Sequence, residues 1–359
     1  MSPGKGAWPR TDAAGNPLNG WRSHKVGSLC GPYFFRVFQI AADLDYLCNY
    51  FHLQHFNARS DVCMFCEANR SDCPWTDARL TASWRMTVRL GDELLLTCHP
   101  LFTSGIGITL AHICPDILHC LDLGTAQHLL GSVFWMLVWN ADFRGTLNER
   151  LGMVWNEITN SYGALNTPVS EQVPHAKVAK ICEKSRSLGP IDYPVLGSKG
   201  AQGRHAVPVL HDVCRRIVGH LEAFDHVTCC LAELSTFYDI VSRGGMYLGD
   251  EVAPQARDAL DRYLIHYNYL ADYNMRRGRH LFYATEKCNH YPAHIAWCCS
   301  YYNPKQGWTY QDEDFMGKIA DIAASTVRGL GPCRLAGALL FRYQTRVHLR
   351  FDRRRAVGW

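Results

Sequence analysis

The chain has 359 residues, of which 47% are hydrophobic and 19% charged, and its net charge is +4. This profile is typical of a globular protein with a large core, and it excludes a fully disordered chain. No uncharged apolar run of about 18 residues occurs, which excludes a transmembrane helix. Residues 1–32 contain no apolar signal-peptide core and predict a flexible lead-in. The 16 cysteines are therefore expected to be mostly reduced thiols of an intracellular protein, nuclear or cytoplasmic.

The first strong element is the mostly apolar stretch "YFFRVFQIAA" at residues 33–42, which predicts a buried strand. Asp43 and Asp45 follow it directly. Catalytic acids of α/β proteins commonly stand just past a buried strand, because the strand fixes them while its tip stays open. A polar strand end or a helix cap is the alternative, and the strand alone favours that alternative.

A Cys-x2-Cys pair, Cys63 and Cys66, comes next in "CMFCEANRSDCPWTD". Two thiolates at this spacing bind one tetrahedral Zn²⁺ from a tight turn, and a structural site needs two further ligands. The nearest candidates along the chain are His99 and His112, together with Cys98 and, as a spare, Cys73. The predicted zinc site is therefore Cys63, Cys66, His99 and His112, and the alternative is a set of ordinary buried thiols.

Residues 115–139 predict a long apolar helix, yet this helix opens with Asp-x-x-His, Asp116 and His119. Residues three apart share a helix face, so the carboxylate would fix the imidazole tautomer and let the histidine contact a phosphate or DNA. In the alternative interpretation Asp116 belongs to the helix N-terminus and His119 is a core histidine.

The rest of the chain predicts a loop over 161–205, helices over about 206–300 and a helix that begins near Asp312. The tail at residues 341–355 carries a charge of +5, which leaves −1 for the remainder. Its arginines recur every four residues and would align on one helix face suited to a phosphate backbone; a solvated helix end is the alternative. These arginines are Arg342, Arg346, Arg350 and Arg354.

Four of these segments, in this order, resemble the transposases of CACTA (En/Spm) and Plavaka-like DNA transposons. The best match is a Pro-Asp-x-x-His-x4-Gly-x3-His stretch, met by Pro115, Asp116, His119, Gly124 and His128. A late Glu four residues before Gly-Lys is met by Glu313, Gly317 and Lys318. A Lys-x-His-x3-His segment is met by Lys287, His290 and His294, with one extra residue after the lysine. The resemblance spans roughly residues 33–350.

The resemblance implies an α/β, mostly helical protein with a partial RNase H-like core. Asp43 would be the second acid and Glu313 the third. The implied parts are a core with the cysteine knuckle at 33–140, a mainly helical insertion at 141–305 and a catalytic-helix segment with the basic tail at 306–359. The implied chemistry is DNA phosphodiester cleavage and strand transfer, in which Asp43, Asp116 and Glu313 converge within about 10 Å to share Mg²⁺ ions. DNA would be the partner, with no membrane, and transposases suggest a homo-oligomer.

Two departures from the family predict a transposase remnant without activity. The family's first acid precedes the second on an early strand, and residues 1–42 offer only Asp12, with no convincing strand to hold it. The arginine that often follows the late Glu is Asp314 here. The alternative function is a non-enzymatic, zinc-stabilised module that binds nucleic acid or a protein. A third and weaker hypothesis is a catalytic zinc site of His99, His112, Asp116 and His119.

Overall fold

The structure is a computed structural model that describes residues 39–89, 99–103, 108–140, 143–184, 193–217, 222–326, 334 and 337–345. The chain divides into two compact units, Met1–Gly307 and Trp308–Trp359, which are described separately below. The mostly helical character expected from the sequence is confirmed.

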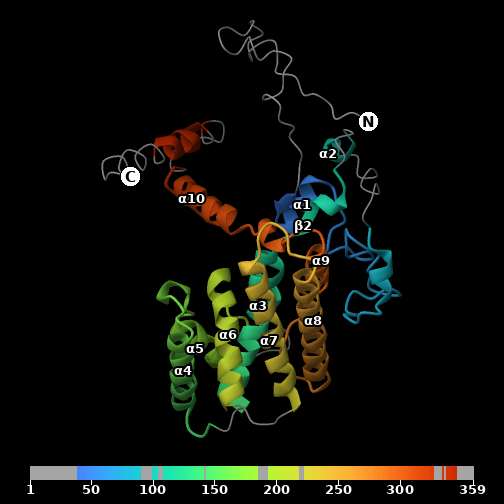
Figure 1. Ribbon diagram of the computed structural model, residues 1–359. Coiled ribbons are helices and arrows are strands. Elements are labelled where there is room, and N and C mark those ends of the chain that lie inside the picture. The colour runs from blue at the N-terminus through green and yellow to red at the C-terminus, as the bar shows by residue number, and fades with distance from the viewer. Residues whose placement is uncertain are drawn as a thin grey trace, which may run out of the picture. The chain divides into compact units, whose positions relative to one another are not determined.

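Long helices that run side by side make up most of the first unit (Figure 1). They are α3 (Ala126–Asn140), α4 (Leu147–Ala164), α5 (His175–Lys184), α6 (Gly200–Ile217), α7 (Glu222–Arg243) and α8 (Val252–Arg276). Helix α8 shows why they pack, because its buried side chains recur every three or four residues, as in Ala256, Leu260, Tyr263 and Tyr267. Burial of this apolar stripe against α7 supplies the stability that an isolated helix lacks.

Two short parallel strands, β1 (Ile40–Ala42) and β2 (Ile113–Pro115), form the sheet of the described residues. Their register pairs Ile40 with Ile113 and Ala42 with Pro115. Strand β2 is buried throughout, whereas Ala41 in β1 is exposed. The expectation of a long buried strand over 33–42 is therefore met only by a partly exposed three-residue strand, and residues 33–38 lie outside the described residues.

Short elements surround this strand pair. After β1 come α1 (Leu44–Tyr50), the 3₁₀ turn η2 (Ser83–Thr87), α2 (Pro100–Thr103) and the 3₁₀ turn η4 (Leu110–His112). Further along lie η6 (Val169–Glu171), the π-helical turn η8 (Glu286–His290), α9 (Tyr291–Cys298) and η9 (Pro304–Gly307). Helix α9 packs on β2, and η9 packs on both strands, so the C-terminal elements of the first unit contact its strand pair.

The predicted helix over 115–139 differs from the observed one at its start. Residues Leu118–Thr125 form the π-helix η5, and a regular α-helix begins only at Ala126. The change occurs at Gly124, whose φ of −95° and ψ of −117° are not helical. A Cβ at Gly124 would meet the His119 carbonyl oxygen at 2.9 Å and the Cys288 sulfur at 3.0 Å, so close packing requires glycine here.

The predicted loop over 161–205 is also corrected. Helix α4 continues to Ala164, α5 occupies His175–Lys184 and α6 begins at Gly200. Val178, Ile181 and Cys182 are buried and lie on one face of α5, which explains why this polar, lysine-containing segment is helical. Among the described residues of this range, 165–168, 172–174 and 193–199 keep the irregular conformation that the composition predicted.

The second unit contains α10 (Tyr310–Thr326) and a helical segment at 337–345. The rings of Phe315 and Tyr343 meet edge to face at 5.4 Å between the two helices. Among the helices described in either unit, none is both long enough and apolar enough to cross a bilayer.

Candidate metal centre and the neighbouring acids

The cysteine knuckle is a tight turn held by backbone hydrogen bonds. The Val62 amide donates to the Ala68 carbonyl at 3.0 Å, which closes the loop around both cysteines. The Phe65 amide donates to the Cys63 sulfur at 3.3 Å. Such an N–H to sulfur contact helps to fix the position of the Cys63 side chain in the turn.

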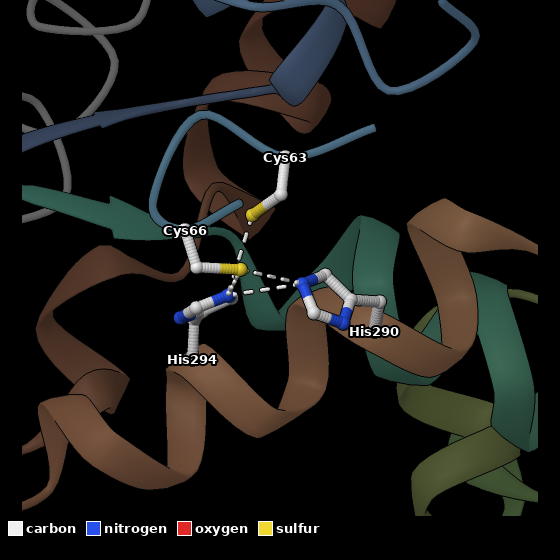
Figure 2. Close-up of side chains that lie close together, drawn as sticks. All are labelled: Cys63, Cys66, His290 and His294. Carbon is white, nitrogen blue, oxygen red and sulfur yellow. Dashed lines mark hydrogen bonds between the residues drawn. The ribbon is translucent and has the colours of Figure 1, made fainter. Parts of the chain in front are cut away.

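Two histidines from the C-terminal part of the first unit face the knuckle. His290 is the last residue of η8, and His294 lies one helical turn later in α9. Figure 2 shows both imidazoles directed at Cys63 and Cys66, which come from a separate loop. The i, i+4 spacing of the histidines places both rings on one helix face.

The four side chains form a compact, buried donor set. The Cys63 sulfur lies 3.3 Å from His294 Nε2, and the Cys66 sulfur lies 3.2 Å from His290 Nε2. The two Nε2 atoms are 3.2 Å apart, and all four donor atoms lie within 4.8 Å of one another. A tetrahedral zinc with the usual bond lengths separates sulfur from nitrogen by about 3.6 Å. The donor set therefore fits a four-coordinate metal ion with no position left for water.

The surroundings of the cluster bury its ligands and shift the pKa values of two of them. Trp84 packs against both imidazoles, with its ring centroid 4.5 Å from that of His290 and 5.6 Å from that of His294. Burial lowers the pKa of His290, which keeps the imidazole neutral and able to donate its lone pair. The hydrogen bond to Cys63 and burial raise the pKa of Cys66, so metal binding releases protons from this cluster.

Two ion pairs hold the segment around the knuckle against the helices. Arg85 of η2 contacts Asp261 of α8 at 2.7 Å, with side chains 19% and 6% exposed. Arg70 contacts Glu286 of η8 at 2.5 Å. Because one pair ends on α8 and the other on the turn that carries His290, the knuckle is positioned even before a metal binds.

The predicted zinc ligands and the observed metal-type cluster share the two cysteines and differ in the histidines. His290 and His294 complete the cluster, and His99 and His112 do not belong to it. The Nδ1 atom of His99 accepts from the Leu101 amide at 3.2 Å, and that of His112 accepts from the Thr109 amide at 3.0 Å. Both histidines thus fix local turns. The described residues contain no second metal-type cluster, so the hypothesis of a catalytic zinc on His99, His112, Asp116 and His119 receives no support.

The predicted acids Asp43 and Asp116 follow register-matched ends of the two parallel strands. Ala42 pairs with Pro115, and the two aspartates are the next residues in each chain segment. Asp43 is the N-cap residue of α1, but its side chain makes no capping hydrogen bond. Instead, the ammonium of Lys287 in η8 donates to Asp43 Oδ1 at 3.2 Å. The helix-cap alternative therefore does not explain the Asp43 carboxylate.

Asp116 and His119 interact as the sequence predicted. Asp116 is fully buried, and its Oδ2 lies 2.5 Å from His119 Nδ1. The hydrogen bond to Asp116 raises the pKa of His119, against the opposing effect of burial. Both carboxylate oxygens also accept backbone N–H groups, from Leu118 at 3.1 Å and from His119 at 3.1 Å. Asp116 is therefore an N-terminal helix residue as well as the partner of His119.

Two π-helical turns carry the groups around these acids. His119 lies in η5 and Lys287 in η8, and the two turns pack together where Cys288 meets Gly124. Besides the hydrogen bond to Asp116, the charge of Asp43 raises the pKa of His119 and the charge of Lys287 lowers it. π-helical turns often mark functional sites because they redirect single side chains.

The remaining predicted residues lie in the second unit. Glu313 is in α10, but its side chain is outside the described residues, so its convergence with Asp43 and Asp116 stays a prediction. Arg342 is exposed in the helical segment 337–345. Arg346, Arg350 and Arg354 lie outside the described residues.

The sequence carried the signal for the ligands that the zinc prediction omitted. His290 and His294 were identified only through the family resemblance, although their His-x3-His spacing by itself suits two metal ligands on a helix. Comparison with known proteins adds no further evidence, since no family model, curated protein or solved structure matches the chain.

Proposed function

We propose that this chain is a transposase-derived protein of the CACTA or Plavaka kind, stabilised by one zinc ion, which binds DNA without cutting it. The observation that supports descent from an RNase H-like enzyme is the pair of acids, Asp43 and Asp116, at matched carboxyl ends of parallel strands. Acids at such positions hold metal ions in α/β enzymes because neighbouring strand ends converge at one edge of the sheet. The order of the motifs around them agrees with the family.

The zinc ion in this proposal is structural. It joins the loop that follows α1 to the helical turns η8 and α9, and Cys66 and His290 are separated by 224 residues in sequence. Four protein ligands leave no open coordination position, which is typical of structural rather than catalytic zinc. The zinc would therefore fix Lys287, three residues before His290, beside the strand-end acids.

The acids as arranged here do not fit Mg²⁺. Both oxygens of Asp116 are engaged by the start of its own helix and by His119. Asp43 is paired with the Lys287 ammonium. Mg²⁺ requires near-octahedral oxygen coordination and dehydrates reluctantly, so a carboxylate that already has a cation is a poor ligand. This disagreement with the parent chemistry leads us to a binding rather than a cleaving function.

The arginine-rich tail supplies the proposed contact with DNA. One helix face with arginines at 342, 346, 350 and 354 would contact successive phosphates and release their counterions. Such binding is electrostatic and weakens steeply as salt increases. It requires no base contacts, so the proposal assigns no DNA sequence preference.

The test combines metal analysis with DNA binding by the full chain and by a chain that ends at residue 341. We expect one zinc per chain and, in the full chain, a linear decrease of log affinity with log salt. Removal of the tail should reduce that slope by roughly 3 to 4, the effect of four lost phosphate contacts. An unchanged slope would refute the tail as the DNA contact, and Mg²⁺-dependent nicking that D43N abolishes would refute the non-cleaving function.

The second candidate is a zinc-stabilised module unrelated to transposases that binds nucleic acid or a protein. The role of Asp116 at the start of η5 favours it, because a buried carboxylate that accepts two backbone amides has a sufficient structural reason to be there. A protein of this kind would keep one zinc per chain. If its partner is nucleic acid, removal of the tail should weaken DNA binding here too; if its partner is a protein, DNA binding should not depend on the tail.

A further inference from the structure

We infer that Lys287 acts as an internal cation that occupies the divalent-metal position at Asp43 and thereby excludes Mg²⁺ from the strand-end acids. This inference rests on the proposed transposase ancestry, because only a transposase ancestor would have bound a divalent metal at these acids. It assigns a role to a lysine that neither the zinc cluster nor the proposed DNA contact uses.

The Lys287 ammonium is bound from several sides. Its Nζ atom lies 3.2 Å from Asp43 Oδ1 and 3.7 Å from Asp45 Oδ2. It also lies 5.4 Å from the centroid of the Phe56 ring, within the range of a cation–π contact. Two carboxylates and an aromatic face therefore surround one positive charge. The lysine side chain is only 20% exposed, so water screens these contacts incompletely.

The backbone of Lys287 has little freedom to withdraw. The next residue, Cys288, packs against Gly124 and donates its amide to the Thr285 hydroxyl at 3.2 Å. His290, three residues on, is a member of the buried metal cluster. The turn that carries Lys287 is thus fixed, so the lysine stays within reach of Asp43, while the ion pairs and the Phe56 ring hold the ammonium itself.

Electrostatics keep this lysine charged. Burial lowers the pKa of Lys287, but Asp43 and the other negative neighbours outweigh burial and raise it overall. A divalent ion bound to Asp43 would lie close to a permanent positive charge in a partly desolvated site, and like charges repel strongly there. Mg²⁺ can therefore bind Asp43 only if the ammonium moves away, and that movement would break its contacts with Asp43, Asp45 and Phe56.

The experiment measures Mn²⁺, a paramagnetic substitute for Mg²⁺, by electron paramagnetic resonance on the zinc-loaded full chain without DNA. K287Q should bind Mn²⁺ at least about tenfold more tightly than the wild type, because one like charge is removed from the site. K305Q is the matched control: Lys305 donates to the Ser242 carbonyl at 2.7 Å and lies on a different element, so its loss should leave Mn²⁺ affinity unchanged. The double variant D43N/K287Q should lose the gain.

Equal Mn²⁺ affinity in K287Q and the wild type would overturn the inference, as would a gain that survives D43N. K287M, whose side chain matches the lysine stem, replaces K287Q if that variant does not fold, and K287R should retain the weak binding. The readout involves no DNA, so failure of the proposed DNA binding and failure of this inference are separate results.

Discussion

The assignment of the two histidines to the metal cluster gives the most direct prediction, which concerns H294N. His294 is 1% exposed and its Nε2 atom lies 3.3 and 3.6 Å from the two cysteine sulfurs, so asparagine at this position removes one of four ligands. Changes in residues that merely support a metal ligand weaken affinity about 10- to 100-fold, and loss of a ligand itself should weaken it by at least about 100-fold.

The effect on stability follows from linkage. At free zinc of 100 times the wild-type dissociation constant, zinc stabilises the wild type by about 2.7 kcal/mol, and H294N by only about 0.4 kcal/mol. The difference of about 2.3 kcal/mol should lower the thermal midpoint by roughly 3 °C for a chain of this size. With the metal removed by a chelator, the two proteins should unfold at more similar temperatures.

The assay is thermal unfolding in zinc buffers, with zinc affinity measured by competition against a chromophoric chelator. H99N and H112N are the matched controls, because these histidines are nearer to the cysteines in sequence but only fix local turns. Each should keep the wild-type zinc affinity. Full zinc affinity in H294N, or its loss in either control, would refute the geometry of the cluster.

Three further predictions concern the surroundings of the site. Because the pKa of His119 is raised in the folded state, protonated His119 stabilises the fold below the unfolded-state pKa of about 6.5, and this stabilisation is lost as pH rises through the folded-state pKa. In urea titrations, H119Q should therefore lose more unfolding free energy at pH 6 than at pH 8.5. A pH-independent loss would contradict this. R85M leaves the buried Asp261 without its partner and should lower the free energy of unfolding by about 3 kcal/mol at pH 7, as measured by urea unfolding. The loss should be smaller at pH 5, where the carboxyl is more readily protonated. A loss under 1 kcal/mol would show that the pair is solvated. G124A should cost about 1–3 kcal/mol through overpacking against Cys288, and a neutral result would mean that the π-helix relaxes.

The zinc prediction shows how far local sequence reasoning extends. Cys63 and Cys66 could be identified because both ligands lie in one turn, where spacing fixes geometry. The histidines could not be identified by proximity along the chain, since the true partners lie more than 220 residues away. Tertiary contacts, among them the Arg70–Glu286 and Arg85–Asp261 ion pairs, bring them together, and no local pattern encodes these contacts.

The helix predictions show a similar limit. The apolar periodicity of residues 115–139 predicted a helix, which is observed, but not its π-helical start at Leu118–Thr125. That start depends on the contact between Gly124 and Cys288, two residues far apart in sequence. Composition also hid α5, because its lysines and alanines are polar or small while three buried side chains suffice to dock it.

The sequence by itself determined the mostly helical composition, the cysteine knuckle, and the local pair of Asp116 and His119, because helical periodicity, turn spacing and i, i+3 contacts are properties of neighbouring residues. Tertiary structure alone decided which histidines face the cysteines and which cation meets Asp43. These contacts depend on closing loops of more than 200 residues, and the free energy that closes them comes from the burial of whole helices rather than from the residues of the site.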